Sequence, residues 1–116
     1  MSLKRIGAGH RMSDAVIHGG KVYLSGYIAE ETVGQSVKAQ TADILAQIDE
    51  TLAQAGSDKT KILKANIWLT DIATWAEMNA AWDAWVVPGQ APARATVEAR
   101  LASPGIDVEI MVEAVI

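Results

Sequence analysis

Residues 36–55 limit what this chain can fold into more than any other segment, because their apolar side chains repeat at the spacing of one helical face. That face consists of Val37, Thr41, Ile44, Leu45, Ile48 and Leu52. Polar residues occupy the remaining positions, and Gly56 follows Ala55 as a left-handed helix stop. An amphipathic helix needs a second layer that covers its apolar face, so the sequence predicts a helix packed on a sheet.

Three further regions have the composition of strands. Residues 15–28 contain two β-rich runs joined by Gly19-Gly20, which predicts a hairpin. Residues 62–69 predict a strand, and so do residues 95–102 and 107–116. In the last segment one face is apolar, with Ile106, Val108, Ile110, Val112, Ala114 and Ile116. The other face carries Asp107, Glu109, Met111, Glu113 and Val115, which is not a plain solvent pattern.

A second helix is predicted over residues 72–87, with Thr70-Asp71 available as caps and Pro88-Gly89 as its end. Helical spacing relates Trp75, Met78, Trp82, Trp85 and Val86, and we expect these residues to form a buried seam, with Trp82 the one nearest a ligand pocket. The element order predicts a single α+β domain over residues 1–116, with two helices on one face of a mixed sheet.

The composition narrows the possible partners. Half of the residues are apolar and 21% are charged, which is apolar enough for part of the surface to meet another subunit. The net charge of −4 and the scattered basic residues argue against nucleic acid. The sequence has no Cys, which excludes thiolate catalysis and disulfides. Without an apolar leader or an 18-residue apolar run, we expect a soluble, unprocessed, cytoplasmic protein that does not enter membranes.

Few residues combine into a recognisable chemical motif. The two histidines, His10 and His18, have no acidic residues at metal-ligand spacing, and His18 is expected at a strand end. Ser25 has no evident partner base. Arg94 stands out because it leaves a loop after Pro92 and enters a strand beside Thr96. A guanidinium offers paired donors that match a carboxylate, although an arbitrary Arg is most often a solvated surface charge.

Several short motifs recur together in one known family. These are Val22-Tyr23-Leu24-Ser25-Gly26, Ala55-Gly56-Ser57, Met78-Asn79, Pro92-Ala93-Arg94-Ala95-Thr96-Val97-Glu98 and Val108-Glu109-Ile110-Met111-Val112-Glu113-Ala114. In this order and spacing they resemble the RidA/YjgF family, also called the RutC or "endoribonuclease L-PSP" family. The run from Met78 to Val87 is most similar to its YoaB-like branch, whose function is poorly defined.

The resemblance implies a chorismate-mutase-like α+β fold in which three subunits pack their sheets into a central barrel. It also implies a ligand site between subunits. Family members of established activity hydrolyse 2-imino acids to 2-oxo acids and ammonia, without a metal or an organic cofactor. The expected partners are therefore a small carboxylate-bearing metabolite and two further copies of the chain.

The same resemblance assigns roles to single residues. Arg94 matches the residue that clamps the substrate carboxylate and is the expected catalytic residue. Ser25-Gly26 matches the pocket lining, and Asn79 matches an Asn with either a structural or a ligand-binding role. Two positions depart from the family pattern: Thr96 replaces a frequent Cys, and Met12 replaces an aromatic residue.

The largest departure is Met111, which occupies the place of a Glu thought to orient the attacking water. Methionine cannot transfer a proton, and general acid–base help contributes about 10²–10⁴-fold. Glu109 and Glu113 lie on the same strand face, each roughly 6–7 Å from Met111. Neither can be assumed to replace the missing group, and Glu98 is a further carboxylate that a site between subunits could use.

Three functions therefore remain open at this point. The first is hydrolysis of 2-imino acids, either slow or of altered specificity. The second is a non-catalytic trimer that binds a small carboxylate and reports it to a partner protein. The third is a ribonuclease, which the family's older name suggests and the acidic charge opposes.

Overall fold

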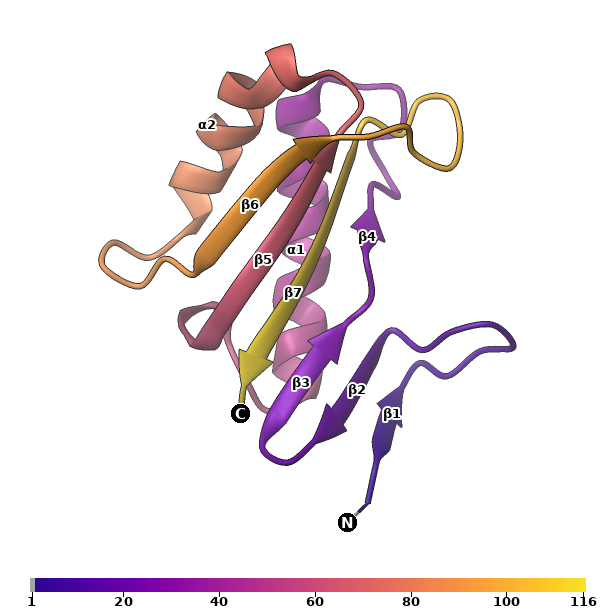
Figure 1. The fold of residues 1–116 in the computed structure, drawn as a ribbon, viewed down its shortest axis with the longest axis vertical. Helices are drawn as coiled ribbons and strands as arrows, with labels where there is room; N and C mark the ends of the chain where they lie inside the picture. The colour runs from indigo at the N-terminus through magenta and orange to yellow at the C-terminus, as the bar shows by residue number, and fades with distance from the viewer. Residues whose placement is uncertain (1) are drawn as a thin grey trace.

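Figure 1 shows a twisted sheet with two helices packed on one face, in a computed structural model that describes residues 2–116. The sheet has the order β1-β2-β3-β7-β5-β6, and β4 pairs with β7 beyond the end of β3. The pairing of β5 with β6 is parallel and the other pairings are antiparallel, which confirms the predicted mixed sheet. The strands are β1 (Lys4–Ile6), β2 (Ala15–His18), β3 (Lys21–Leu24), β4 (Tyr27–Ile28), β5 (Ile62–Leu69), β6 (Ala93–Glu98) and β7 (Val108–Val115).

Helix α1 (Val37–Gln54) matches the amphipathic segment that the sequence predicted. Ser36 caps its first turn by accepting a hydrogen bond from the Ala39 amide at 3.1 Å. At its end, Gly56 adopts a φ of 82° and the Ser57 amide donates to the Leu52 carbonyl at 2.8 Å. This closing pattern needs a left-handed residue, which explains why the helix stops where the glycine stands.

The predicted hairpin is formed by β2 and β3, with His18 paired to Lys21 across the turn. Gly19 and Gly20 both have positive φ, at 61° and 79°. A two-residue turn with two left-handed positions matches the twist of antiparallel strands, and two glycines adopt it without strain. His18 is the last residue of β2, as expected for a strand-end residue.

The two faces of β7 differ as its alternation predicted. Val108, Ile110, Val112 and Ala114 are buried against the helices. Glu109, Met111 and Glu113 lie on the opposite face, which no helix covers and which faces the viewer in Figure 1. Ile116 was expected on the buried side but is 44% exposed, because it follows the last residue of β7.

Two predicted boundaries are wrong. Strand β6 ends at Glu98 rather than at Ala102, because its partner β5 ends at Leu69, which is paired with Glu98. The second helix begins with a 3-10 turn, η2 (Ile72–Thr74), before α2 (Trp75–Trp85). The helix ends at Trp85 and Val86 is extended, and Pro88 disfavours helical geometry at Val87, so the helix does not reach residue 87 as predicted.

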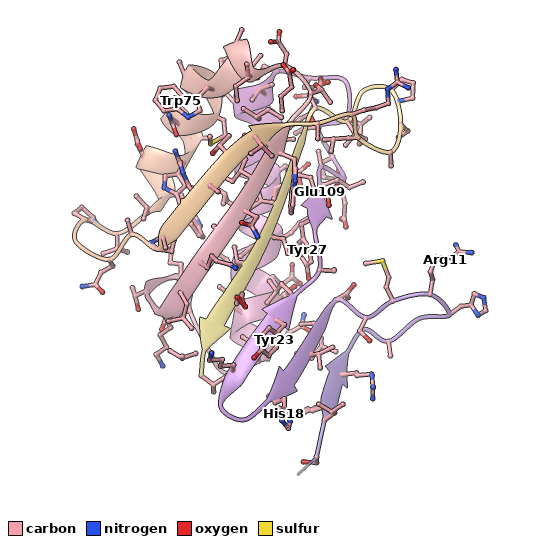
Figure 2. The ribbon with its side chains drawn as sticks, viewed as in Figure 1. Arg11, His18, Tyr23, Tyr27, Trp75 and Glu109 are labelled. Atoms are coloured by element: carbon pink, nitrogen blue, oxygen red, sulfur yellow. The ribbon has the colours of Figure 1, made fainter. Side chains whose placement is uncertain are left out.

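The expected tryptophan seam is only partly formed. Trp82 is buried at 5% exposure, and Trp85 packs beside it with ring centres 5.3 Å apart. The Trp85 indole donates to Asp49 Oδ2 at 2.9 Å, which ties α2 to α1. Trp75 is 50% exposed, so its assignment to the buried seam is wrong. Its place in the first turn of α2 leaves it on the outside of the helical layer, as Figure 2 shows.

Candidate functional site

Arg94 belongs to the edge strand β6, and its side chain contacts helix α2. Its pairing with Ala65 of β5 places it on the helix-covered face of the sheet. The guanidinium carbon lies 5.1 Å from the centre of the Trp82 ring, and Nη1 lies 3.8 Å from Met78 Sδ. Within residues 2–116 Arg94 forms no ion pair. A partly buried cation that rests on an indole and lacks an acidic partner is available to an anion.

Two polar side chains accompany Arg94. Thr96 follows on the same face of β6, and its hydroxyl oxygen is buried without a hydrogen-bond partner among the described residues. Buried hydroxyls are usually paired, so this one calls for a ligand or a second chain. Asn79 follows Met78 on α2 and is half-buried. The structure thus places three predicted residues on one edge of the molecule: Arg94, Thr96 and Asn79.

A second group of predicted residues lies on the other side of the sheet's centre. Ser25 and Gly26 form the link between β3 and β4, and Met12 lies in the loop before β2. All three line a cavity of about 530 Å³ that extends toward α1. The Ser25 amide and hydroxyl both donate to the Asp14 carbonyl, at 3.0 and 3.3 Å. These contacts fix the strand link at the mouth of the cavity.

The charge of this cavity is negative. Asp14, Glu30 and Glu50 contribute to its wall, and none of its described lining residues is basic. The pKa of the Tyr27 hydroxyl is raised in the same environment, mainly by burial. A hydrogen bond to Thr51 at 2.6 Å lowers this pKa, but the three carboxylates raise it further. Such a wall repels a carboxylate ligand, so the cavity by itself lacks the group that would bind one.

A network of hydrogen bonds to Asp43 and Gln47 fixes the loop that forms one cavity wall. Asp43 Oδ2 accepts from the amides of Glu30, Glu31 and Thr32 at 2.9–3.1 Å, and from the Thr32 hydroxyl at 2.8 Å. Gln47 donates both to Asp43 Oδ1 and to the Ile28 carbonyl, each at 2.9 Å. Residues 28–32 are therefore anchored to α1, and the cavity is largely preformed.

Met111 lies on the open face of β7, opposite Asn66 of β5. It is 36% exposed and, with Tyr23 and Lys64, lines a shallow depression of about 270 Å³. Glu113 borders the same depression and pairs with Lys64 Nζ at 3.8 Å. The position that the family pattern gives to a Glu therefore carries a methionine beside an ion pair in this chain.

One chain does not bring the two groups of predicted residues together. Arg94 is paired with Ala65, and Ala65 is paired with Val112, so two strand spacings separate β6 from β7. Ser25-Gly26 lies one strand further, about 14 Å from Arg94 across the sheet. Arg94 and Met111 also point from opposite faces. The predicted residues therefore lie in two groups, which we call half-sites: Arg94, Thr96 and Asn79 belong to β6 and α2, while Met12, Ser25 and Gly26 line the acidic cavity. Met111 lies apart from both, in its own depression on the open face.

Metal binding finds no support in the described part of the chain, where no three His, Cys, Asp or Glu side chains converge. No helix within residues 2–116 is long and apolar enough to cross a membrane. That the protein acts without a cofactor stays a prediction.

Sequence reasoning missed two features of the site. It assigned Trp82 to the core, with at most a position near the pocket, whereas the ring is also the support on which Arg94 rests. It also missed that Gly26 leaves room for the Glu109 carboxylate: a side-chain carbon at Gly26 would overlap Glu109 Oε2. The first could be expected from the common pairing of Arg with Trp. The second depends on strand register and has no signal in the sequence.

The fold and these half-sites define a small α+β protein of the YjgF type. The chain matches the family described as endoribonuclease L-PSP over residues 2–116 and belongs to that family. It is 47% identical over 116 residues to the RutC family protein YoaB of Escherichia coli K12, with all of both chains covered. It is 43% identical over 112 residues to a RutC family protein of Haemophilus influenzae, which covers 97% of each chain.

The fold comparison agrees. The crystal structure of a YjgF family member from Neisseria meningitidis superposes with a TM-score of 0.95 and is 50% identical, covering 99% of this chain and 95% of the other. A YjgF family member from Mycobacterium tuberculosis has a TM-score of 0.89 at 28% identity, covering 99% of this chain and all of the other. The predicted family and the predicted α+β fold, with two helices on a mixed sheet, are thus confirmed, and the trimer stays a prediction.

Proposed function

We propose that this protein forms a homotrimer that hydrolyses 2-imino acids to 2-oxo acids and ammonia at sites between subunits. The observation that supports this most directly is Arg94, a partly buried guanidinium with an aromatic support and no acidic partner in residues 2–116. Its paired donors match the carboxylate that every 2-imino acid carries. The unpaired Thr96 hydroxyl offers a further hydrogen bond at the same edge.

The separation of the two half-sites supports assembly between copies. Arg94 provides the cation that the acidic cavity beside Ser25-Gly26 lacks. A second copy that placed its β6 edge against this cavity would unite the two groups. The uncovered face of the sheet also exposes apolar side chains, with Tyr23 at 41% and Val97 at 50%. Contact with further copies would cover that surface.

The chemistry asked of such a site is modest. Imines hydrolyse readily in water, so holding the substrate carboxylate and orienting the C=N carbon toward one water molecule accelerates the reaction by itself. The arrangement uses side chains of this protein throughout and needs no electron transfer.

A second function is favoured by Met111. Since methionine cannot transfer a proton, the loss of the usual Glu fits a trimer that binds a small carboxylate without turning it over. In that case the Arg94 half-site would act as a receptor for a 2-oxo or amino acid.

The first test measures ammonia release from enzymatically generated 2-iminopropionate with wild type, Arg94→Ala and Arg100→Ala. Arg100 is exposed in the loop after β6 and serves as a matched control for loss of positive charge. We expect Arg94→Ala to lower kcat/KM by roughly 10–100-fold, which corresponds to one charged hydrogen-bonding interaction, and Arg100→Ala to change little.

Two other outcomes decide between the functions. If wild type gives no acceleration while pyruvate raises its Tm in an Arg94-dependent way, the binding function is correct and the hydrolase is wrong. If neither activity nor an Arg94-dependent shift is seen with any of several 2-imino and 2-oxo acids, both functions are wrong.

A further inference from the structure

We propose that Glu109 is the catalytic carboxylate that activates water in this site, replacing the Glu that Met111 displaces. The inference rests on the proposed hydrolase function and names the residue that would make it efficient. Three carboxylates are candidates for this role, Glu98, Glu109 and Glu113, and the sequence alone does not distinguish them. The structure gives each of them a different environment.

Glu98 and Glu113 already have partners. Glu98 Oε1 accepts a hydrogen bond from the Ile72 amide at 3.0 Å and so caps the 3-10 turn before α2. It also lies on the helix-covered face of β6. Glu113 is paired with Lys64 at 3.8 Å on the open face. A carboxylate that holds a helix end or a neighbouring cation is less free to take a proton from water.

Glu109 has no such partner. In the part of the chain that the structure describes, its carboxylate makes neither a hydrogen bond nor an ion pair, although the residue is half-buried. It stands on the open face of β7, paired with Ile28 of β4 on one side and Trp68 of β5 on the other. Partial burial between two apolar neighbours disfavours an unpaired charge, so this carboxylate calls for water, a ligand or a second chain.

Glu109 also lies directly against Gly26. The Glu109 carboxylate lies so close to Gly26 that a side-chain carbon there would overlap Oε2. Figure 2 shows Glu109 beside β4, the strand that begins directly after Gly26. Ser25-Gly26 is the predicted pocket lining and also lines the 530 Å³ cavity. Glu109 is thus in contact with one of the predicted residues of the second half-site.

Glu109 lies one strand repeat from Met111, yet its carboxylate reaches the Gly26 backbone directly. The strand register places residues 24–26 opposite residues 111–112 of β7, so the Glu109 side chain extends along the strand from its own position toward the Ser25-Gly26 link. Ile28, two residues after Gly26, is the direct partner of Glu109. Met111 instead borders the depression around Tyr23 and Lys64.

The proposed step balances without any added reactant. Glu109 takes one proton from water while the water oxygen bonds to the imine carbon, and it passes this proton to the nitrogen as the C=N double bond becomes a C–N single bond. Glu109 then takes the proton of the new hydroxyl as the C=O bond forms and passes it to the nitrogen as the C–N bond breaks. The nitrogen has then received both protons of the water and leaves as ammonia. The net reaction consumes one water and yields a 2-oxo acid and ammonia.

The experiment compares wild type, Glu109→Gln, Glu113→Gln and Arg94→Ala, all as full-length protein. Steady-state kinetics with enzymatically generated 2-iminopropionate give kcat and KM, and the Tm shift caused by pyruvate reports binding. Light scattering and Tm without ligand check assembly and folding. Glu113→Gln is the matched control, since it removes the same charge from the same face of the same strand.

We expect Glu109→Gln to lower kcat by about 10²–10⁴-fold with KM changed less than about threefold, and to keep the pyruvate shift. Glu113→Gln should keep kcat within about threefold. If wild type is active and depends on Arg94 while Glu109→Gln keeps its kcat, this inference is wrong and the hydrolase function stands. A loss of kcat in Glu109→Gln that is accompanied by loss of assembly overturns it equally, because Glu109 would then be a structural contact between copies and not the group that activates water. Absence of any acceleration by wild type overturns both proposals.

Discussion

The Arg94 guanidinium carbon lies 5.1 Å from the centre of the buried Trp82 ring, at the open edge of the sheet. The face of the Trp82 indole restricts the Arg94 side chain, and Met78 Sδ contacts Arg94 Nη1 at 3.8 Å. Long side chains lose conformational entropy when a ligand fixes them, so an Arg that is already supported binds an anion at lower cost. The contact with Trp82 therefore requires a planar guanidinium at position 94, and not merely a positive charge.

Arg94→Lys keeps the positive charge but loses the paired donors and the planar contact with Trp82. Because lysine acts as a single flexible point charge, we expect pyruvate affinity to fall about tenfold, while Tm without ligand changes by less than about 2 °C. Isothermal titration of wild type and variant measures this difference. Equal affinities would show that charge alone is recognised and that the aromatic support is irrelevant.

Gly26→Ala tests the contact between Gly26 and Glu109. The added methyl group would overlap Glu109 Oε2, and the flexible carboxylate can move away, so we expect little loss of stability. Activity should fall at least about tenfold because the carboxylate is displaced from its position against Gly26. Gly9→Ala is the control, since Gly9 has no positive φ and its nearest neighbour, the Met12 carbonyl, would lie at 3.4 Å. Unchanged kcat in Gly26→Ala would argue that the position of Glu109 does not matter.

Local sequence patterns were sufficient to predict most of the fold. The amphipathic period of residues 36–55, the glycine pair of the hairpin and the alternation along β7 each follow from short-range geometry. Strand ends were predicted less well: Glu98 ends β6 because β5 ends beside it, and that information lies in the pairing of strands far apart in the sequence. The short strand β1 was missed for the same reason, since three residues carry too little pattern.

The candidate site was predictable as a set of residues but not as an arrangement. The family motifs indicate Arg94, Ser25-Gly26 and Met111, yet their separation onto two edges and two faces depends on the strand order β4-β7-β5-β6. Likewise, nothing in the sequence distinguishes Glu109 from Glu113. The difference arises because Lys64 lies beside one of them and Gly26 beside the other.

Asp43 should make stability depend on pH in the acid range. Burial opposes its charge, but hydrogen bonds from Gln47, Thr32 and the amides of Glu31 and Glu30 outweigh this and hold its pKa below the ordinary value of 3.8. The unfolded chain therefore binds the proton more readily. The resulting stabilisation is complete above the ordinary pKa and disappears as the pH falls through the lower folded pKa.

Asp43→Asn removes this dependence. We expect the variant to be about 1–2 kcal/mol less stable than wild type near pH 7, and the difference to shrink as the pH drops below about 4. Urea unfolding at pH 7, 5, 4 and 3 measures it, with Asp83→Asn, an exposed position on α2, as the control for charge removal. A difference that stays constant over this range would show that the carboxylate charge does not contribute.

The proposed trimer predicts that the uncovered face of the sheet is sensitive to charge. Val97 is 50% exposed on β6, paired with Trp68 of β5 on that face, whereas Val33 is 49% exposed in the loop before α1. In an isolated chain, Val97→Asp and Val33→Asp should have similar small effects. In a trimer that covers the open face, Val97→Asp buries an unpaired carboxylate and should dissociate the assembly.

Light scattering should therefore give a mass of three 12.3 kDa chains for wild type and Val33→Asp, and a smaller mass for Val97→Asp. A monomeric wild type at micromolar concentration would exclude the trimer, and with it any site that needs Arg94 from a second copy. A trimer that tolerates Val97→Asp would place the contact on another face of the molecule.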